Sequence, residues 1–214
     1  LVTYEIGLWI KQKTGKAIAN ALLISVILIV AVLLLFHIDY ETYANGAQYI
    51  SIFLTPATVS LAVPLYRQLE LLKTYPKAIF GGIIAGVLTA MVSVFALSLM
   101  FGLNHEQYVT LLPKSITTAI GMGISEKMGG IVTITVVVII VTGILGNILA
   151  ETICRLCKIE DPIAKGLAIG TSAHALGTAK AMELGEIEGA MSSLSIVVCG
   201  ILTVISVSIF ANFI

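Results

Sequence analysis

One stretch near the carboxyl end carries much of the polar chemistry that this largely apolar sequence offers. It runs from Gly166 to Lys180 and contains glycines, hydroxyl side chains, a histidine and a lysine. Lipid offers these groups no hydrogen-bond partners, so the stretch is expected to face protein or a watery cavity. The predicted binding residues within it are Ser172, His174 and Thr178, and the predicted helix breaks are Gly170 and Gly177.

Two groups in this region can exchange protons. The imidazole of His174 changes charge near neutral pH, which would let it couple anion movement to protons. Glu188 stands immediately before an uncharged segment that starts at Gly189, where a carboxylate can act at a helix N-terminus. A buried histidine is also a common packing residue that is held by hydrogen bonds, and this second interpretation stays open. Lys180 is expected at the membrane boundary.

A second polar cluster lies within Leu112 to Thr118. A lysine in mid-bilayer costs roughly 2.5 to 3.5 kcal/mol unless it pairs or reaches the interface. Lys114 lies close enough to the start of its segment for such snorkelling, but hydroxyl groups and a proline surround it. A cation beside hydroxyls and a helix start is suited to binding a carboxylate. The predicted binding residues here are Lys114, Ser115, Thr117 and Thr118, and the predicted break is Pro113.

Composition assigns the chain to the membrane. Of 214 residues, 58% are hydrophobic and 11% are charged, against about 25% charged in soluble domains. Twelve basic and twelve acidic residues balance, which argues against a nucleic-acid partner. The sequence has no catalytic triad, metal-ligand cluster or phosphate-binding loop, so we expect no enzyme, no metal and no cofactor. The three cysteines are expected to be packing residues.

The distribution of charge predicts an all-α polytopic membrane protein. Four segments are long enough to span a bilayer and lack charge: residues 17–36, 78–103, 129–150 and 189–214. Two further segments, residues 42–66 and 107–125, are interrupted by prolines. Because proline removes a helical hydrogen bond, these two should be broken or re-entrant helices.

An internal repeat organises these segments. Shifting the chain by 114 positions pairs Ile6-Gly7 with Ile120-Gly121, and Gly86 to Thr89 with Gly200 to Thr203. We therefore predict two repeats, residues 1–106 and 107–214, with the first span truncated at its start. The same shift places Thr55 to Ser60 on Ile169 to His174, and paired interrupted segments mark binding sites in transporters. This adds Thr55, Thr58 and Ser60 to the predicted binding residues and Pro56 to the predicted breaks.

The relative orientation of the two repeats depends on the interrupted segments. If every segment spans, the repeats are parallel; if residues 42–75 and 161–188 are hairpins, the repeats are inverted. The numbers of Lys and Arg in the loops separate these alternatives only weakly. We expect inversion, because irregular backbone at membrane depth is usually built in this way in transporters.

Several longer motifs resemble a known family. They are Leu54 to Gln68, Leu112 to Thr118, Gly129-Gly130, Thr142-Gly143-Ile144, Gly170 to Ala181 and Gly189-Ala190. Together they resemble the LrgB-like (CidB/LrgB, antiholin-like) membrane proteins over nearly the whole chain. The chain has Ala119 where family members tend to have a proline, which affects only the local helix break.

The resemblance implies two different functions. Bacterial members are named antiholins, which implies regulation of a small holin-like (LrgA-like) membrane partner, of murein hydrolase export and of autolysis. The family also resembles a plastid glycolate/glycerate translocator and is linked to pyruvate uptake. The clustered cation, imidazole and hydroxyls favour a secondary transporter of small monocarboxylates that works by alternating access. A homodimer in the bacterial inner (cytoplasmic) membrane is expected by analogy, and a channel is a third interpretation.

Overall fold

The structure is a computed structural model that describes residues 1–15, 19–53, 56, 59–60, 62–67 and 69–214. Within these ranges the regular elements are all helices, as the sequence predicts. The chain divides into two compact units, Leu1–Leu61 and Ala62–Ile214, which we describe separately.

The first unit contains helices α1 (Val2–Thr14), α2 (Ala21–Leu35) and α3 (Tyr40–Ser51). Helix α1 packs on α2, where Gly7 lies against the backbone of Ala21. The hydroxyl oxygens of Thr3 and Ser25 are 2.8 Å apart across this contact.

Helix α2 is shorter than the span predicted at residues 17–36. Its 15 residues correspond to about 22 Å, whereas the hydrocarbon core is about 30 Å thick. The reason is Asn20, whose side-chain oxygen accepts the N–H groups of Leu22 and Leu23 and so begins the helix there. The predicted length of this span was therefore too long.

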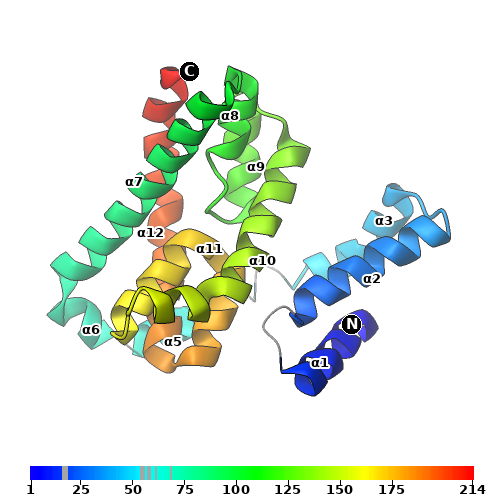
Figure 1. The fold of residues 1–214 in the computed structure, drawn as a ribbon, viewed down its shortest axis with the longest axis horizontal. Helices are drawn as coiled ribbons and strands as arrows, with labels where there is room; N and C mark the ends of the chain where they lie inside the picture. Colours follow the sequence, from blue (N-terminus) through cyan, green and yellow to red (C-terminus); the bar gives the residue numbers. More distant parts are fainter. Residues whose placement is uncertain (16–18, 54–55, 57–58, 61, 68) are drawn as a thin grey trace. The chain divides into compact units, whose positions relative to one another are not determined.

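The second unit is built on three long apolar helices, which are the described helices long and apolar enough to cross a membrane. They are α7 (Pro76–Phe101), α10 (Val132–Leu156) and α12 (Glu186–Phe210), the last extended by the 3-10 turn Ala211–Phe213. These helices confirm three of the four predicted spans. The shorter elements are α5 (Ala62–Arg67), α6 (Leu69–Thr74), α8 (His105–Leu111), α9 (Thr118–Lys127) and α11 (Pro162–Leu184) (Figure 1).

Helices α7 and α12 run in the same direction. Near their ends, the rings of Phe95 and Phe213 have centroids 5.5 Å apart, and the hydroxyl of Tyr108 donates to the carbonyl of Phe210 over 2.9 Å. Near their beginnings, both helices contact α11. We call the end of the unit where α7 and α12 begin end A, and the end where they finish end B. Helix α10 runs from end B to end A.

Helices α8 and α9 form a hairpin that enters from end B. Thr110 of α8 and Ser125 of α9 both lie beside Thr135, whose hydroxyl oxygen is 2.9 Å from the Thr110 carbonyl and 2.7 Å from the Ser125 hydroxyl. Farther in, Gly121 lies against Ile139 of α10. The tip of the hairpin, residues 112–117, therefore lies deeper along α10 than its open end. The predicted break at Pro113 lies in this tip.

Helix α11 forms a second hairpin, which enters from end A. Its backbone departs from helical geometry at His174 (φ 44°, ψ −139°). Before this point Gly170 lies against Ser192 of α12, and after it the hydroxyl of Thr178 is 2.7 Å from that of Ser192. One level of α12 thus contacts both arms, so the chain reverses at His174. The break lies at His174 itself, between the predicted breaks Gly170 and Gly177, where close packing accounts for the glycines.

The directions of these elements bear on the repeat. Helices α7 and α12, which the 114-residue shift equates, run the same way, so for this pair the structure favours the parallel alternative over the inverted one that we expected. The two helices run the same way because α8–α9 and α11 both re-enter and do not cross the unit. Only α10 crosses it between the end of α7 and the start of α12, which returns the chain to end A. The two-repeat division at residue 106 stays a prediction.

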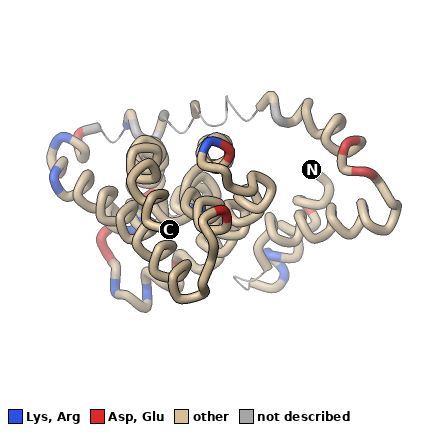
Figure 2. The backbone as a smooth tube through the Cα atoms, turned by 90° about the horizontal axis from the view of Figure 1, so that it is seen from above, with Lys and Arg blue, Asp and Glu red and all other residues tan. Residues whose placement is uncertain are grey.

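An inverted relation exists within the second unit. Residues 105–156 form a hairpin from end B and then a span, whereas residues 162–213 form a hairpin from end A and then a span in the opposite direction. The two segments are 57 positions apart, half of 114, and at this spacing Ser115 matches Ser172, and Gly143-Ile-Leu145 matches Gly200-Ile-Leu202. Figure 2 shows the long stretches without acidic or basic residues that separate the charged turns.

The hairpin topology predicts which positions face the same side of the membrane. In a chain whose natural cysteines are replaced, single cysteines at Glu160 and Glu183, before and near the end of α11, should react with an impermeant thiol reagent from one side. A cysteine at Glu106, at end B, should react from the other side. Labelling of right-side-out and inverted vesicles measures this. Reaction of the Glu160 and Glu183 positions from opposite sides would contradict the hairpin.

Candidate functional site

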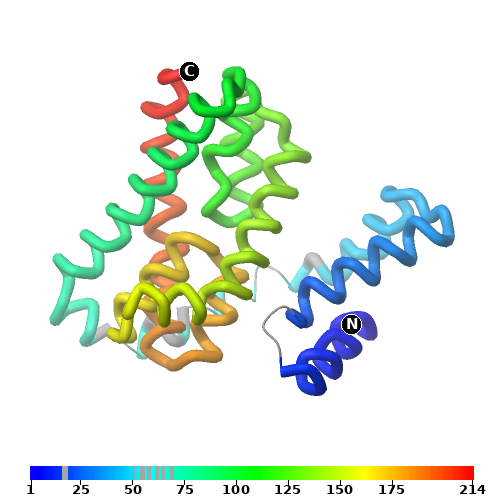
Figure 3. The backbone as a smooth tube through the Cα atoms, in the orientation of Figure 1, coloured from blue at the N-terminus to red at the C-terminus, as the bar shows by residue number. Residues whose placement is uncertain are grey.

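The tips of the two hairpins border the same open cavity of the second unit. The cavity has a volume of about 1030 Å³, and helix α7 forms one wall. Lys114 and Ser115 contribute from the α8–α9 tip, and Thr171 and Ser172 from the first arm of α11. Figure 3 shows that the chain approaches this level from both ends of the long helices. The structure therefore brings together three predicted residues: Lys114, Ser115 and Ser172.

Lys114 is the cationic group of this cavity. Its ammonium group donates to the hydroxyl of Ser115 over 3.0 Å, and within the described residues it forms no ion pair with a carboxylate. The surrounding tip is buried, with Leu112 at 0% and Ile116 at 3% exposure. A half-buried ammonium group without a counter-ion favours binding of an anion, because the anion would offset the cost of removing the charge from water.

Hydroxyl groups of α7 form part of the cavity and were missed from the sequence. Thr89 and Ser93 line it together with Gly82 and Gly86. The sequence could have indicated these residues, because the four positions follow the spacing of one helix face on an otherwise apolar helix. The glycines of this face also allow close helix packing. Such packing is present, since Gly86 lies against Thr171.

His174 sits at the turning point of α11 but outside the cavity lining. It is 4% exposed, and its Nε2 lies 3.0 Å from the carbonyl oxygen of Ile139 in α10. Because a carbonyl only accepts, Nε2 carries the proton, and in a neutral ring Nδ1 is then the acceptor. Its positive φ is a conformation that costs a non-glycine residue about 1 to 3 kcal/mol. The hydrogen bond of the imidazole to Ile139 and the burial of the ring hold this conformation in place.

Four other predicted binding or coupling residues of the second unit do not line the cavity. Thr178 is buried, and its hydroxyl donates to the His174 carbonyl over 3.0 Å, which holds the second arm at the turn. Thr117 precedes α9 and Thr118 is its first residue. Glu188 is 9% exposed in the first turn of α12, beside Gly185 and Gly166.

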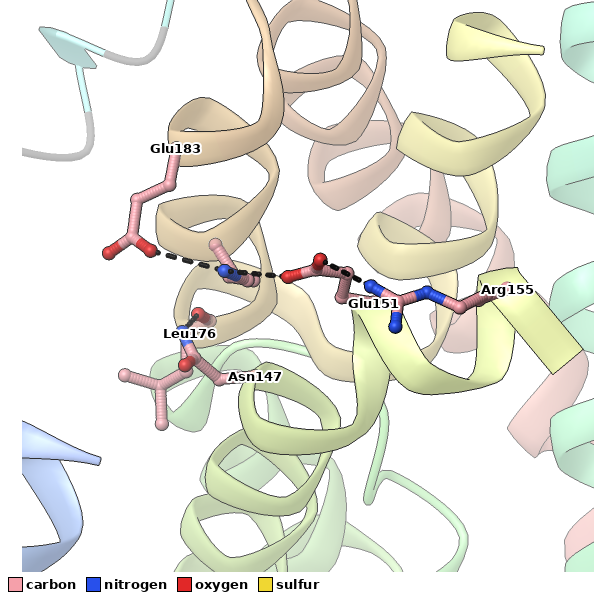
Figure 4. Close-up of polar contacts among 6 residues, drawn as sticks. Asn147, Glu151, Arg155, Leu176 and Glu183 are labelled. Carbon is pink, nitrogen blue, oxygen red and sulfur yellow. Dashed lines mark hydrogen bonds and ion pairs between the residues drawn. The ribbon is translucent and has the colours of Figure 1, made fainter. Parts of the chain in front are cut away.

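A polar network attaches the second arm of α11 to α10. The side chain of Asn147 donates to the Leu176 carbonyl over 2.7 Å. One turn further, Lys180 lies 3.5 Å from Glu151 and 3.3 Å from Glu183 (Figure 4). Asn147 thus makes a hydrogen bond between α10 and α11, and Lys180 belongs to an ion-pair network at end A.

The remaining predicted residues belong to the first unit. Ser60 donates its hydroxyl to the carbonyl of Pro56 over 2.8 Å, which satisfies a backbone group. Thr55 and Thr58 lie outside the described residues. Participation of these three residues in a site with Lys114 stays a prediction.

The contact between α10 and the tip of α11 yields a test of the fold around the site. A β-carbon at Gly143 would lie 2.7 Å from an imidazole carbon of His174, so Gly143→Ala should destabilise the protein by about 1 to 3 kcal/mol. The matched control is Gly123→Ala, where the space is open, and there the higher helix propensity of alanine should keep or raise stability. Thermal unfolding in detergent measures both. Equal melting temperatures for the two variants would contradict the packing described.

Comparison with known proteins assigns the chain to a family. Residues 1–213 match the LrgB-like family. The chain is 37% identical over 215 residues to the antiholin-like protein LrgB of Bacillus cereus (strain B4264), covering 100% of this chain and 94% of that protein. The antiholin-like protein LrgB of Bacillus anthracis (strain CDC 684 / NRRL 3495) is similar to the same extent. No solved structure matches the chain. The chain belongs to the LrgB-like family of membrane proteins.

Proposed function

We propose that this protein is a secondary carrier that moves small monocarboxylates across the bacterial inner membrane by alternating access. The observation that carries the proposal is the cavity at which two hairpins from opposite ends of the unit meet, with Lys114 in its wall. Interrupted helices that meet near mid-depth are the usual construction of carrier binding sites. Closing one hairpin or the other would expose the cavity to one side at a time.

The chemistry of the cavity supports a monoanionic substrate that carries a further oxygen. One cation, Lys114, matches one carboxylate. The hydroxyl of Ser115, which accepts from Lys114, can donate to a neighbouring hydroxyl or carbonyl oxygen. The hydroxyls of Thr171 and Ser172 donate to the Ala168 carbonyl, and their oxygens can accept from a substrate hydroxyl. Glycolate, glycerate and pyruvate combine these groups and are the smallest suitable test substrates.

Proton coupling through His174 is a further part of this proposal. The imidazole joins the turn of α11 to α10 through its hydrogen bond with Ile139, so a change of its charge would alter how the hairpin is held. Glu188, in the first turn of α12, is the second candidate group. Coupling implies that an inward proton gradient accelerates uptake and that His174→Asn removes this acceleration.

The second candidate function is regulation of a small holin-like, LrgA-like partner that controls murein hydrolase export and autolysis. It is favoured by the names of the relatives, both of which are antiholin-like proteins. A regulator needs packing surfaces, whereas a half-buried lysine in a cavity has no evident part in that role. Co-purification with such a partner, together with full biological activity of Lys114→Gln, would favour regulation. A homodimer is compatible with either function.

Reconstituted liposomes test the carrier directly. Labelled glycolate and pyruvate should accumulate in liposomes that contain the pure protein, with a rate that saturates. Lys114→Gln should lower uptake at least about tenfold, because a hydrogen bond to a charged group contributes about 1.5 to 3 kcal/mol.

Two variants control this experiment. Lys114→Arg keeps the charge and should retain part of the uptake, and Lys127→Gln removes a charge at the end of α9, away from the cavity, and should leave uptake unchanged. Absence of substrate-dependent uptake over a range of pH and ion gradients would exclude the carrier. Flux that does not saturate, accompanied by single-channel currents, would instead indicate a channel.

A further inference from the structure

Most polar side chains of the cavity described above lie at one end, and its other end is lined mainly by apolar side chains, with Asp161 among them. Its polar side chains gather at the hairpin tips and beside Thr89 and Ser93 of α7. Toward end A the lining changes to apolar side chains. These are Leu71, Ala78, Ile163, Leu167 and Ile187, with the ring of Tyr75.

This cavity is long. The lining positions on α7 extend from Ala78 to Ser93, which at the rise of an α-helix corresponds to about 22 Å. A volume of about 1030 Å³ matches the upper range of sites that hold drug-sized ligands, roughly 300 to 1,000 Å³. A two- or three-carbon acid bound at Lys114 would fill a small part of it and leave the apolar wall in contact with water.

The charges along the cavity favour one orientation of a ligand. Lys114 lies at the tip of the α8–α9 hairpin, which is the inner end of the cavity. Asp161 lies at end A, where it is exposed and accepts the N–H of Ala164 at the start of α11. A carboxylate is therefore attracted to the inner end and disfavoured at the outer one, which leaves an attached tail along the apolar wall.

We infer that the preferred ligand of this cavity is a monocarboxylate with an apolar tail, of the class of 2-hydroxy or 2-oxo acids with about five or six carbons. This inference rests on the proposed function and extends it from the smallest acids to amphipathic ones. The carboxylate binds at Lys114, the 2-oxygen contacts the hydroxyls of the hairpin tips, and the tail extends toward end A along Ala85, Ala168 and Leu167.

A chain-length series tests the inference without requiring transport. The purified protein in detergent is titrated with 2-hydroxy acids of two to six carbons, and the ligand-induced rise in melting temperature gives an apparent Kd for each acid. We expect the apparent Kd to fall about fourfold per added methylene, the ratio that corresponds to burial of a methylene group. Apparent Kd values that stay constant or rise with chain length would overturn the inference.

Three controls separate binding in the cavity from partition into detergent. The neutral amide of the six-carbon acid should give no comparable shift, because it lacks the charge that Lys114 binds. Ala85→Phe, which fills part of the apolar wall, should abolish the gain for the longest acids, whereas Ala96→Phe, on the same helix but outside the lining, should preserve it. The same dependence of apparent Kd on chain length in these two variants would overturn the inference.

Uptake by liposomes distinguishes this inference from the proposed function. If glycolate is taken up but the longer acids neither compete nor stabilise the protein, the carrier stands and the inference fails. If the apparent Kd falls with chain length as expected but no acid is transported, the binding site stands and the carrier fails.

Discussion

Backbone groups inside a bilayer need hydrogen-bond partners, and the second unit depends on how its two interrupted segments meet this requirement. Both segments pack against the three long helices of the unit. The tip of α8–α9 is buried around Leu112 and Ile116, and the turn of α11 is held by His174 and Thr178. Irregular backbone at depth is tolerated where it is buried in protein or lines a water-filled cavity, and here the two tips pack on protein and border the cavity.

Close packing makes this frame possible. Gly166 and Gly170 bring the first arm of α11 against α12, and Gly143 and Gly146 let the turn approach α10. The network of Asn147 and Lys180 then attaches the second arm to α10, while the first arm borders the cavity. The two arms therefore differ in what they contact, and the arm that faces the cavity is the one that a ligand would influence.

The sequence predicts the membrane class, three of the spans and the interruption at Pro113, because these follow from long uncharged runs and from the missing N–H of proline. It also identifies Lys114, Ser115 and Ser172, which the structure brings to one cavity. It does not predict that α11 turns at His174 itself, since a strained backbone at a non-glycine residue is a tertiary effect. Nor does it predict the direction of the repeats, which depends on which segments re-enter. Thr89 and Ser93 could have been found from their spacing along α7.

We propose that a carboxylate binds between the two hairpin tips. Single cysteines at Ser115 and Ser172, one on each tip, together with a control at Ser208 near the end of α12, allow the rate of thiol modification to be measured with and without a monocarboxylate. The acid should slow modification at both tips and leave the rate at Ser208 unchanged. Unchanged rates at both tips, or slowing at one tip alone, would contradict a site shared by the two hairpins.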